Sequence, residues 1–300
     1  MSRLPTIGFD TSAINALENA GLLSEPLMAG LEAGFHVVLP ALSAEEVISA
    51  QKEVRRNALL DRIVRLLRSG ECLWPPHELL RLMVSAHFQS PSAFDWTRVP
   101  VRAKLYEEGI IARDFPAELF KEQLEEHSKL IEGFENMWSP MRPKLDAVIA
   151  EGRAKRPESF GEAMTEVATV EGGFFWTIAR LLYQRVSGTE LSETQLRSFL
   201  AACPPFRAVC FAMAMGWYNF ALKVSQPGEP EPPGRNDLLM AVYLPYCGRF
   251  VAKDWPQERD LRQIATQAEI ACEVLSFRDF SDGFSPMAGA ARSTLASVTL

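Results

Sequence analysis

Short apolar runs, each ending at an acidic residue or a proline and each followed by helical spacing, constrain this chain most. Thr6–Phe9 runs into Asp10, and the β-branched run from His36 ends at Pro40. A strand followed by an amphipathic helix, repeated along a chain, predicts an α/β fold with a parallel sheet and helices on both faces. The predicted strands are Thr6–Phe9, His36–Pro40, Glu71–Trp74, Arg249–Ala252 and Cys272–Phe277.

The alternation of strands and helices is interrupted between the third and fourth predicted strands. Helical segments dominate there, with prolines and glycines between them and no persistent strand alternation. The segments are expected at 77–88, 100–111, 115–137, 140–154, 159–187 and 192–224. The following stretch, SQPGEPEPPG at 225–234, has the composition of a linker. We therefore predict a core over 1–76 and 235–280, a helical insertion over 77–234 and a loose tail over 281–300.

Two helices of the predicted core contain some of the acidic residues that are considered below. A long helix is expected over Ser43–Ser69, and a second over 237–246 with Asn236 as its cap. Composition supports a packed core, because 47% of the 300 residues are hydrophobic and 23% are charged. Five scattered cysteines without a CxxC pair, and four histidines without zinc-type spacing, argue against a disulfide framework and a zinc site.

The N-terminus lacks the apolar run of a secretory leader, and the most apolar stretch is too short to span a bilayer. We therefore expect a cytoplasmic protein without a membrane segment. A net charge of −7 argues against coating nucleic acid through bulk charge, although a local basic patch remains open.

Acidic residues follow several of the predicted strands, where ligands bind in an open parallel sheet. Asp10 ends the first strand, Glu45 and Glu46 open the helix after the second, Asp237 opens the helix after the linker, and Asp254 follows the fourth strand. Carboxylates that converge repel one another, and a divalent cation relieves that repulsion; oxygen ligands suit Mg²⁺ or Mn²⁺. The alternative is that each acid is a helix cap favoured by the macrodipole.

The same segments resemble the motifs of PIN-domain nucleases. IGFDTSAIN at 7–15 resembles the opening strand and first acid, and VVLP at 37–40 with AEEV at 44–47 resembles the second motif, where Glu46 fits the glutamate position better than Glu45. The closing part is similar to Asn236-Asp237 followed by FVAKD at 250–254. The resemblance covers the core and not the insertion, which is far longer than a minimal PIN domain allows. Lys253 also departs from the usual small or acidic residue.

The resemblance implies a PIN-like three-layer domain that cuts RNA, or sometimes DNA flaps, with metal-activated water. Asp10, Glu46 and Asp237 would then hold the main Mg²⁺ or Mn²⁺ ion, and Asp254 would complete a second site or position the nucleophile. Three further polar side chains, Thr11, Ser12 and Asn236, are expected to support the site. For Thr11 and Ser12 the alternative is that they cap the helix.

A basic helical face and the insertion are the candidate partner surfaces. The segment 50–70 carries a net charge of +4 and places Lys52, Arg55, Arg62 and Arg65 on roughly one face. That face is a candidate phosphate track, or a solvated amphipathic face. The insertion holds 17 basic and 21 acidic residues, so we expect a helical cap or protein-binding module whose tryptophans are mostly core. A homodimer and an antitoxin partner also remain open.

Two other functions fit parts of this pattern. A magnesium-dependent phosphohydrolase of the haloacid-dehalogenase type also has a strand-end aspartate and a helical cap, but it needs a second acid two residues later, where Ser12 stands. A PIN-like binding or scaffold protein without catalysis would keep the fold alone. Metal-dependent RNA cleavage separates a nuclease from a scaffold, and turnover of a phosphomonoester would favour the phosphohydrolase.

Overall fold

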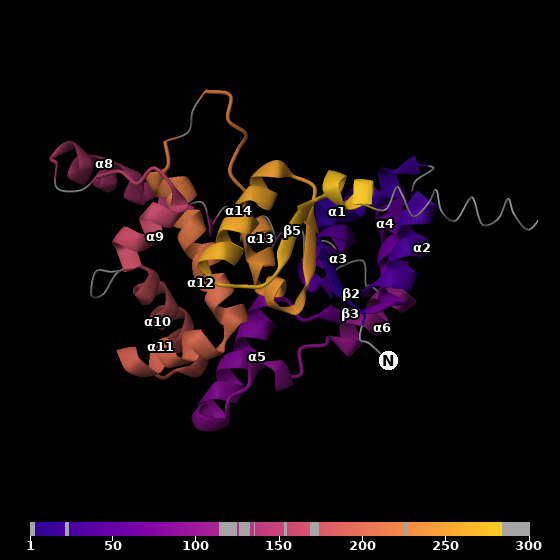
Figure 1. Cartoon of the computed structure of the whole chain (residues 1–300), viewed down its shortest axis with the longest axis horizontal. Helices are drawn as coiled ribbons and strands as arrows, with labels where there is room; N and C mark the ends of the chain where they lie inside the picture. Colours follow the sequence, from indigo (N-terminus) through magenta and orange to yellow (C-terminus); the bar gives the residue numbers. More distant parts are fainter. Residues whose placement is uncertain are drawn as a thin grey trace, which may run out of the picture.

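Five strands form one parallel sheet at the centre of the molecule, in the order β3-β2-β1-β4-β5 (Figure 1). The computed structural model describes residues 4–21, 24–113, 125, 133–134, 136–152, 155–168, 174–224 and 227–283. The strands are β1 (Thr6–Phe9), β2 (His36–Pro40), β3 (Gly70–Leu73), β4 (Arg249–Ala252) and β5 (Glu273–Ser276). The prediction of an α/β fold with a parallel sheet is confirmed, and each predicted strand is present.

The central strand β1 marks the point at which the strand order reverses. The chain adds β2 and β3 on one side of β1, and then β4 and β5 on the other. Gly8 of β1 pairs with Val38 of β2 and with Phe250 of β4, both in parallel register. The backbone N–H of Asp10 donates to the carbonyl of Val251 at 3.1 Å. The carboxyl ends of β1 and β4 therefore lie together at a topological switch point, where open α/β sheets bind ligands.

One face of the sheet packs against the first four helices, which lie to its right in Figure 1. These helices are α1 (Thr11–Asn19), α2 (Ser24–Gly34), α3 (Ala41–Ile48) and α4 (Glu53–Leu67). Ile7 and Phe9 of β1 are buried in this layer, whereas Val38 and Phe250 of the neighbouring strands are buried in the opposite layer. This alternation is the two-residue period of a strand that is covered on both faces.

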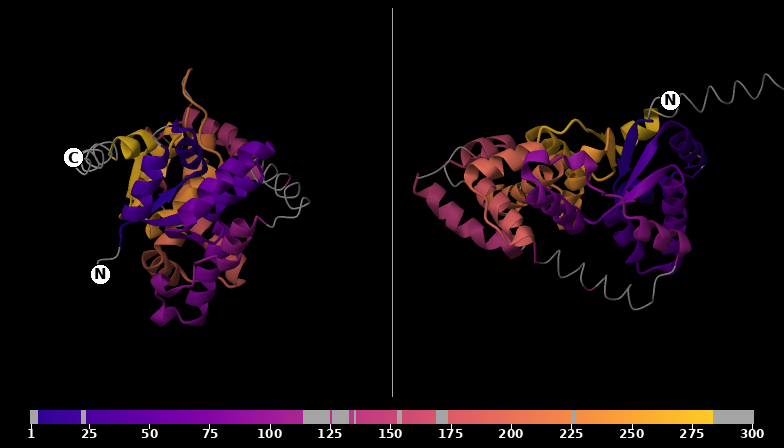
Figure 2. Two further views of the ribbon diagram at one scale, coloured as in Figure 1. Left: turned by 90° about the vertical axis from the view of Figure 1, so that its right-hand side faces the viewer. Right: turned by 90° about the horizontal axis from the view of Figure 1, so that it is seen from below.

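The other face packs against helices of the C-terminal half and of the insertion, as the right-hand view of Figure 2 also shows. The described helices after β3 are α5 (Pro76–Gln89), α6 (Lys104–Ala112), α8 (Arg142–Ala150), α9 (Phe160–Ala168), α10 (Phe174–Ser187), α11 (Glu193–Ala202), α12 (Pro204–Trp217), α13 (Arg235–Leu239) and α14 (Trp255–Gln267). Of these helices, α6 instead packs in the first layer, through Ile110. Short 3-10 helices lie at Pro91–Ala93, Trp96–Arg98, Ser139–Met141 and Met240–Tyr246.

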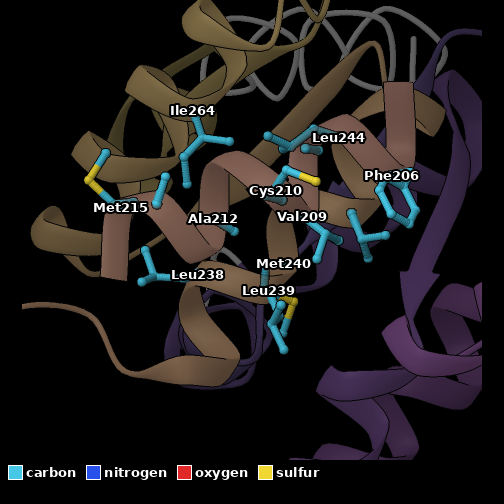
Figure 3. Packing of buried hydrophobic residues seen from close by; sticks show 14 of the residues in the cluster. Phe206, Val209, Cys210, Ala212, Met215, Leu238, Leu239, Met240, Leu244 and Ile264 are labelled. Atoms are coloured by element: carbon cyan, nitrogen blue, oxygen red, sulfur yellow. The ribbon is translucent and has the colours of Figure 1, made fainter. Parts of the chain in front are cut away.

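Helix α12 joins the insertion to the sheet through one continuous hydrophobic cluster. Phe206 and Cys210 of α12, Leu244 of the following 3-10 helix and Ile264 of α14 meet in this cluster (Figure 3). The same cluster includes Phe250 of β4. The insertion therefore shares its core with the sheet, and the predicted boundary at 234 is not a break in packing.

Two predicted helices are interrupted in the structure. The prediction of one helix over Ser43–Ser69 is wrong, because α3 ends at Ile48 and α4 begins at Glu53. No glycine or proline marks this break. Arg56 Nη1 stabilises it by donating to the carbonyl of Ala50 at 3.1 Å.

The predicted helix over 192–224 is bent by 107° between α11 and α12. Pro204 and Pro205 begin α12 at this bend, because proline disfavours helix in the residue before it and has no N–H to donate. A π-helix follows at Tyr218–Leu222. Across the described helices, none alone has the length and apolar character to cross a membrane; α11 and α12 reach them only as a bent pair.

β3 is an edge strand of the sheet, and its outer edge is covered by the chain that follows α5. The carbonyl of Cys72 accepts from the N–H of Ala103 at 2.8 Å, and its N–H donates to Glu107 Oε1 at 2.7 Å. Arg102 balances the charge of Glu107 at 2.8 Å. An isolated antiparallel bridge joins Leu73 to Arg102, and the rest of the described insertion is helices and turns. Most of the segment predicted at 115–137, and residues 284–300 of the predicted tail, lie outside the described residues.

Candidate active site

Asp10 lies at the carboxyl end of β1 and is only 1% exposed. Its Oδ1 accepts from the backbone N–H of Ala13 at 2.6 Å, which makes it the N-cap of α1. Its Oδ2 accepts from Ser12 Oγ at 2.6 Å. Each carboxylate oxygen has two lone-pair sites, so the cap leaves each oxygen a further position for a ligand. Capping therefore does not exhaust the acceptor capacity of the Asp10 carboxylate.

Glu46 lies on α3 and is held from two sides. Thr11 Oγ1 donates to its Oε2, and Asn236 Nδ2 donates to its Oε1 at 3.1 Å. Its neighbour Glu45 instead accepts from Tyr106 at 2.9 Å. Glu46, rather than Glu45, is therefore the acid that contacts other predicted site residues. Both glutamates lie in the second turn of α3, because the helix begins directly after Pro40. The alternative that they are acids favoured at the start of a helix therefore does not explain them.

Asp237 lies in the first turn of α13. Its Oδ2 accepts from the N–H of Gly234 at 3.0 Å. Gly234 is the N-cap residue, so the prediction that Asn236 caps this helix is wrong. Asn236 lies within the first turn, and its side chain bonds Glu46 across the site.

Asp254 occupies the N-cap position of α14 and is exposed. Its side chain makes no capping hydrogen bond, which separates it from the ordinary capping acid. The N–H of the preceding Lys253 donates to Ser12 Oγ at 3.3 Å. Ser12 therefore connects Asp10 to the turn that carries Asp254, and the supporting residues predicted at Thr11, Ser12 and Asn236 all contact the acids or the adjoining backbone.

Burial and mutual repulsion set the charge state of two of these acids. Burial raises the pKa of Asp10 from its ordinary 3.8 to about 7; the hydrogen bonds from Ser12 and Ala13 oppose this rise, while the charges of Asp237 and Asp254 add to it. Burial also raises the pKa of Asp237 to about 6, with repulsion from Glu46 as the next cause. Asp237 therefore lies within electrostatic range of the other three predicted acids.

The donor atoms suit a hard divalent cation in chemistry and charge. They are carboxylate oxygens, supported by hydroxyls and an amide, and a cation would offset the repulsion that raises the pKa of Asp10 and Asp237. The acids interact two at a time, as Asp10 does with Asp237 and Asp237 with Glu46, and do not surround one common point. Within the described ranges, no group of three or more His, Cys, Asp or Glu side chains is gathered tightly enough to hold a metal ion.

Two residues just after Asp254 belong to the site region although the sequence analysis did not single them out. Gln257 is 3% exposed, and its Nε2 lies 3.4 Å from the carbonyl of Asp237. Its Oε1 is buried without a hydrogen-bond partner in the described part of the chain. Trp255 is exposed directly beside Asp254. Their positions in the first turn of the helix after a strand-end acid were the available indication.

The basic face of α4 has partners other than a nucleic acid in this structure. Arg55 donates to the side chains of Asn15 and Asn19 on α1. Arg62 pairs with Glu18 and Glu25, and Arg65 with Glu25 and Glu32. These arginines therefore fasten α4 to α1 and α2, and the phosphate-track interpretation stays a prediction. Lys52 is exposed at the start of α4.

Three comparisons with known proteins found no relative of this chain. No protein-family model, no curated protein and no solved structure matches the chain. The functional argument therefore rests on the arrangement of this chain's own residues.

Proposed function

We propose that this protein is a metal-dependent endonuclease with a PIN-like core, which hydrolyses phosphodiester bonds in RNA. The observation that carries the proposal is that hydrogen bonds join the segments of all four acids at the β1–β4 switch point: Asn236, next to Asp237, bonds Glu46, and Ser12 joins Asp10 to the backbone of Lys253, next to Asp254. Asp10 is acted on by Asp237 and Asp254, and Asp237 by Glu46 and Asp254. Acids placed in this way repel one another, and a cation between them would offset that repulsion.

The topology supports the PIN-like part of the proposal. The strand order 3-2-1-4-5 places the first and last acids of the motif beside each other at the carboxyl edge. The second acid comes from the helix after β2 and the third from the helix before β4. This is the order Asp, Glu, Asp, Asp on which the resemblance of the sequence to PIN-domain nucleases is based.

Each acid and its partners have a role in this proposal. Asp10, Glu46 and Asp237 would hold a Mg²⁺ or Mn²⁺ ion once their carboxylates draw closer together than they stand here, and the more exposed Asp254 would complete a second site or position the attacking water. Thr11 and Asn236 keep the Glu46 carboxylate oriented by donating to both of its oxygens. A metal ion held there would supply water of lowered pKa and would neutralise charge that develops on the phosphate.

The cysteines offer no competing nucleophile. Burial raises the pKa of all five thiols, so they are protonated at neutral pH and unreactive. Attack by water is the simpler chemistry. The haloacid-dehalogenase alternative also lacks its second acid, because that position is occupied by Ser12. The Ser12 hydroxyl donates a hydrogen bond to Asp10 instead.

Cleavage of single-stranded RNA with and without EDTA tests the proposal. We expect wild type to cut in Mg²⁺ or Mn²⁺ and to stop in EDTA, and Asp10→Asn to be inactive in both. Equal cleavage in EDTA would refute a metal-dependent reaction. Turnover of p-nitrophenyl phosphate without RNA cleavage would favour the phosphohydrolase, and metal-independent RNA binding without any turnover would favour the scaffold.

A further inference from the structure

An exposed tryptophan stands directly beside the proposed site. Trp255 follows Asp254 and is 57% exposed, whereas Trp138 and Trp217 of the insertion are buried, as predicted. Among the exposed large hydrophobic side chains of the described residues, Phe88 is the other aromatic. A ring as large as indole leaves considerable apolar surface in water when it is exposed, and such a ring next to a cluster of acids is well placed to contact a substrate.

The indole ring is held in place by a chain of contacts that leads into the protein. The Arg259 guanidinium lies over the Trp255 ring, 5.0 Å from its centroid. Arg259 is anchored in turn by Asp260 at 2.6 Å, and Asp260 accepts from Asn219 at 2.7 Å. Asp260 and Asn219 are both buried. The ring is therefore preorganised, which reduces the entropy lost when a ligand stacks on it.

A basic residue precedes the same acid in the chain. Lys253 precedes Asp254, is exposed, and has no ion pair within the described part of the chain. Its backbone is fixed by the hydrogen bond to Ser12. In a protein of net charge −7, whose proposed site consists of carboxylates, a lysine at this point is suited to attract a phosphate that the acids would otherwise repel.

We infer that Lys253 and Trp255 form a nucleotide-binding pair around Asp254, in which Trp255 stacks on an unpaired base and Lys253 contacts an adjoining phosphate. The inference rests on the proposed nuclease function, and it specifies the substrate as a single strand. A base within a duplex is already stacked on both faces, so only an unpaired base can stack on the indole ring. Aromatic stacking tolerates any base, so we expect little dependence on sequence.

Binding of fluorescently labelled oligonucleotides, measured by anisotropy in EDTA, tests the inference separately from cleavage. We expect Trp255→Ala to weaken binding of a short single-stranded oligouridylate by roughly 5- to 150-fold, and Trp255→Phe to restore part of the loss. An abasic ribose-phosphate oligomer should bind wild type and Trp255→Ala equally weakly. Lys253→Ala should lower the slope of log affinity against log salt by about one.

Phe88→Ala on α5 is the matched control, because it also removes an exposed aromatic ring; its binding should equal that of wild type. Thermal melts check that the variants fold. If wild type binds and cleaves but Trp255→Ala binds the oligouridylate unchanged, the inference fails and the nuclease proposal stands. If wild type shows the Trp255-dependent binding without metal-dependent cleavage, the nuclease proposal fails and the stacking site stands. If Trp255→Ala weakens only capture of a protein partner, the inference is refuted.

Discussion

Asn236 donates from Nδ2 to Oε1 of Glu46 at 3.1 Å, across 190 residues of sequence. Glu46 belongs to the helix after β2, whereas Asn236 lies beyond the whole insertion. Because Asp237 follows Asn236 directly, this hydrogen bond also places the third acid of the proposed site relative to the second. The site is therefore complete only when the segments before and after the insertion are packed together.

Asp10→Asn should abolish metal-dependent RNA cleavage and leave the fold intact. Asparagine is as good an N-cap as aspartate, so the bond to Ala13 is kept, while the charge that holds a hard cation is lost. Without metal, the melting temperature should stay unchanged or rise, because one member of a repelling group is removed. Asp10→Ala, which loses the cap as well, should be less stable than Asp10→Asn by about 1 kcal/mol. A variant that melts lower and still cleaves would show that Asp10 is only a cap.

Glu46→Gln and Glu45→Gln form a matched pair that tests which acid serves the site. The Glu46 oxygens contact Thr11 and Asn236, whereas Glu45 contacts Tyr106. We therefore expect Glu46→Gln to reduce cleavage at least about 100-fold, the scale of losing a metal-supporting group, and Glu45→Gln to retain most activity. The measurement is kcat on RNA under saturating Mg²⁺. The opposite ranking would contradict the assignment of Glu46.

The stability of the metal-free protein should depend on pH through Asp10. Its folded pKa of about 7 lies above the ordinary 3.8, so the folded state binds more protons within this window. Its contribution to the free energy of unfolding therefore falls as pH rises from about 4 to about 7, and Asp237, with a pKa raised to about 6, acts in the same direction. We expect the melting temperature of wild type, relative to Asp10→Asn, to increase as pH is lowered from about 8 to about 5. A difference that does not change with pH would argue against the raised pKa.

Arg62→Gln and Arg65→Gln should affect stability rather than nucleic-acid binding. Both arginines are partly buried and pair with acids on α1 and α2, so each change should lower the free energy of unfolding by about 1 kcal/mol. Arg68→Gln removes the same charge from an exposed position beyond the end of the helix and should be close to neutral. Denaturant unfolding and oligonucleotide binding are measured for all three. Weaker RNA binding by the first two variants than by Arg68→Gln would favour the phosphate-track interpretation.

Gly8→Ala should destabilise the sheet. A Cβ at this position would lie 2.8 Å from Cys247 Sγ and 2.8 Å from Phe250 Cδ2, so we expect a loss of about 1–3 kcal/mol in the free energy of unfolding. Gly34→Ala is the control, because a Cβ there meets nothing within 4 Å; its effect should stay within about 0.5 kcal/mol. Urea unfolding compares the two, and equal stability would show that the side chains of Cys247 and Phe250 can move aside at no cost.

The sequence predicted those features that depend on local patterns. The strands were recognisable from short apolar runs, and Asp10 and Asp254 from their places at strand ends. The break between α3 and α4 was not, because no glycine or proline marks it and because long-range contacts, such as those of Arg62 with Glu18 and Glu25, determine how α4 packs. The exposure of Trp255 likewise depends on how α14 packs, which residue spacing does not reveal.

β2 and β4, the two strands that flank β1, are synthesised at very different times. Ile7 pairs with Val37, only 30 residues later, whereas Thr6 receives a hydrogen bond from Gly248, 242 residues later. Loop-closure entropy makes the longer connection only about 2 kcal/mol less favourable, so the sheet tolerates the insertion. Translation at ordinary rates places roughly 10–40 s between Glu46 and Asn236. If the proposed site cuts RNA, a nascent chain lacks Asp237 and Asp254 throughout that interval and is inactive until the segment after the insertion has been made.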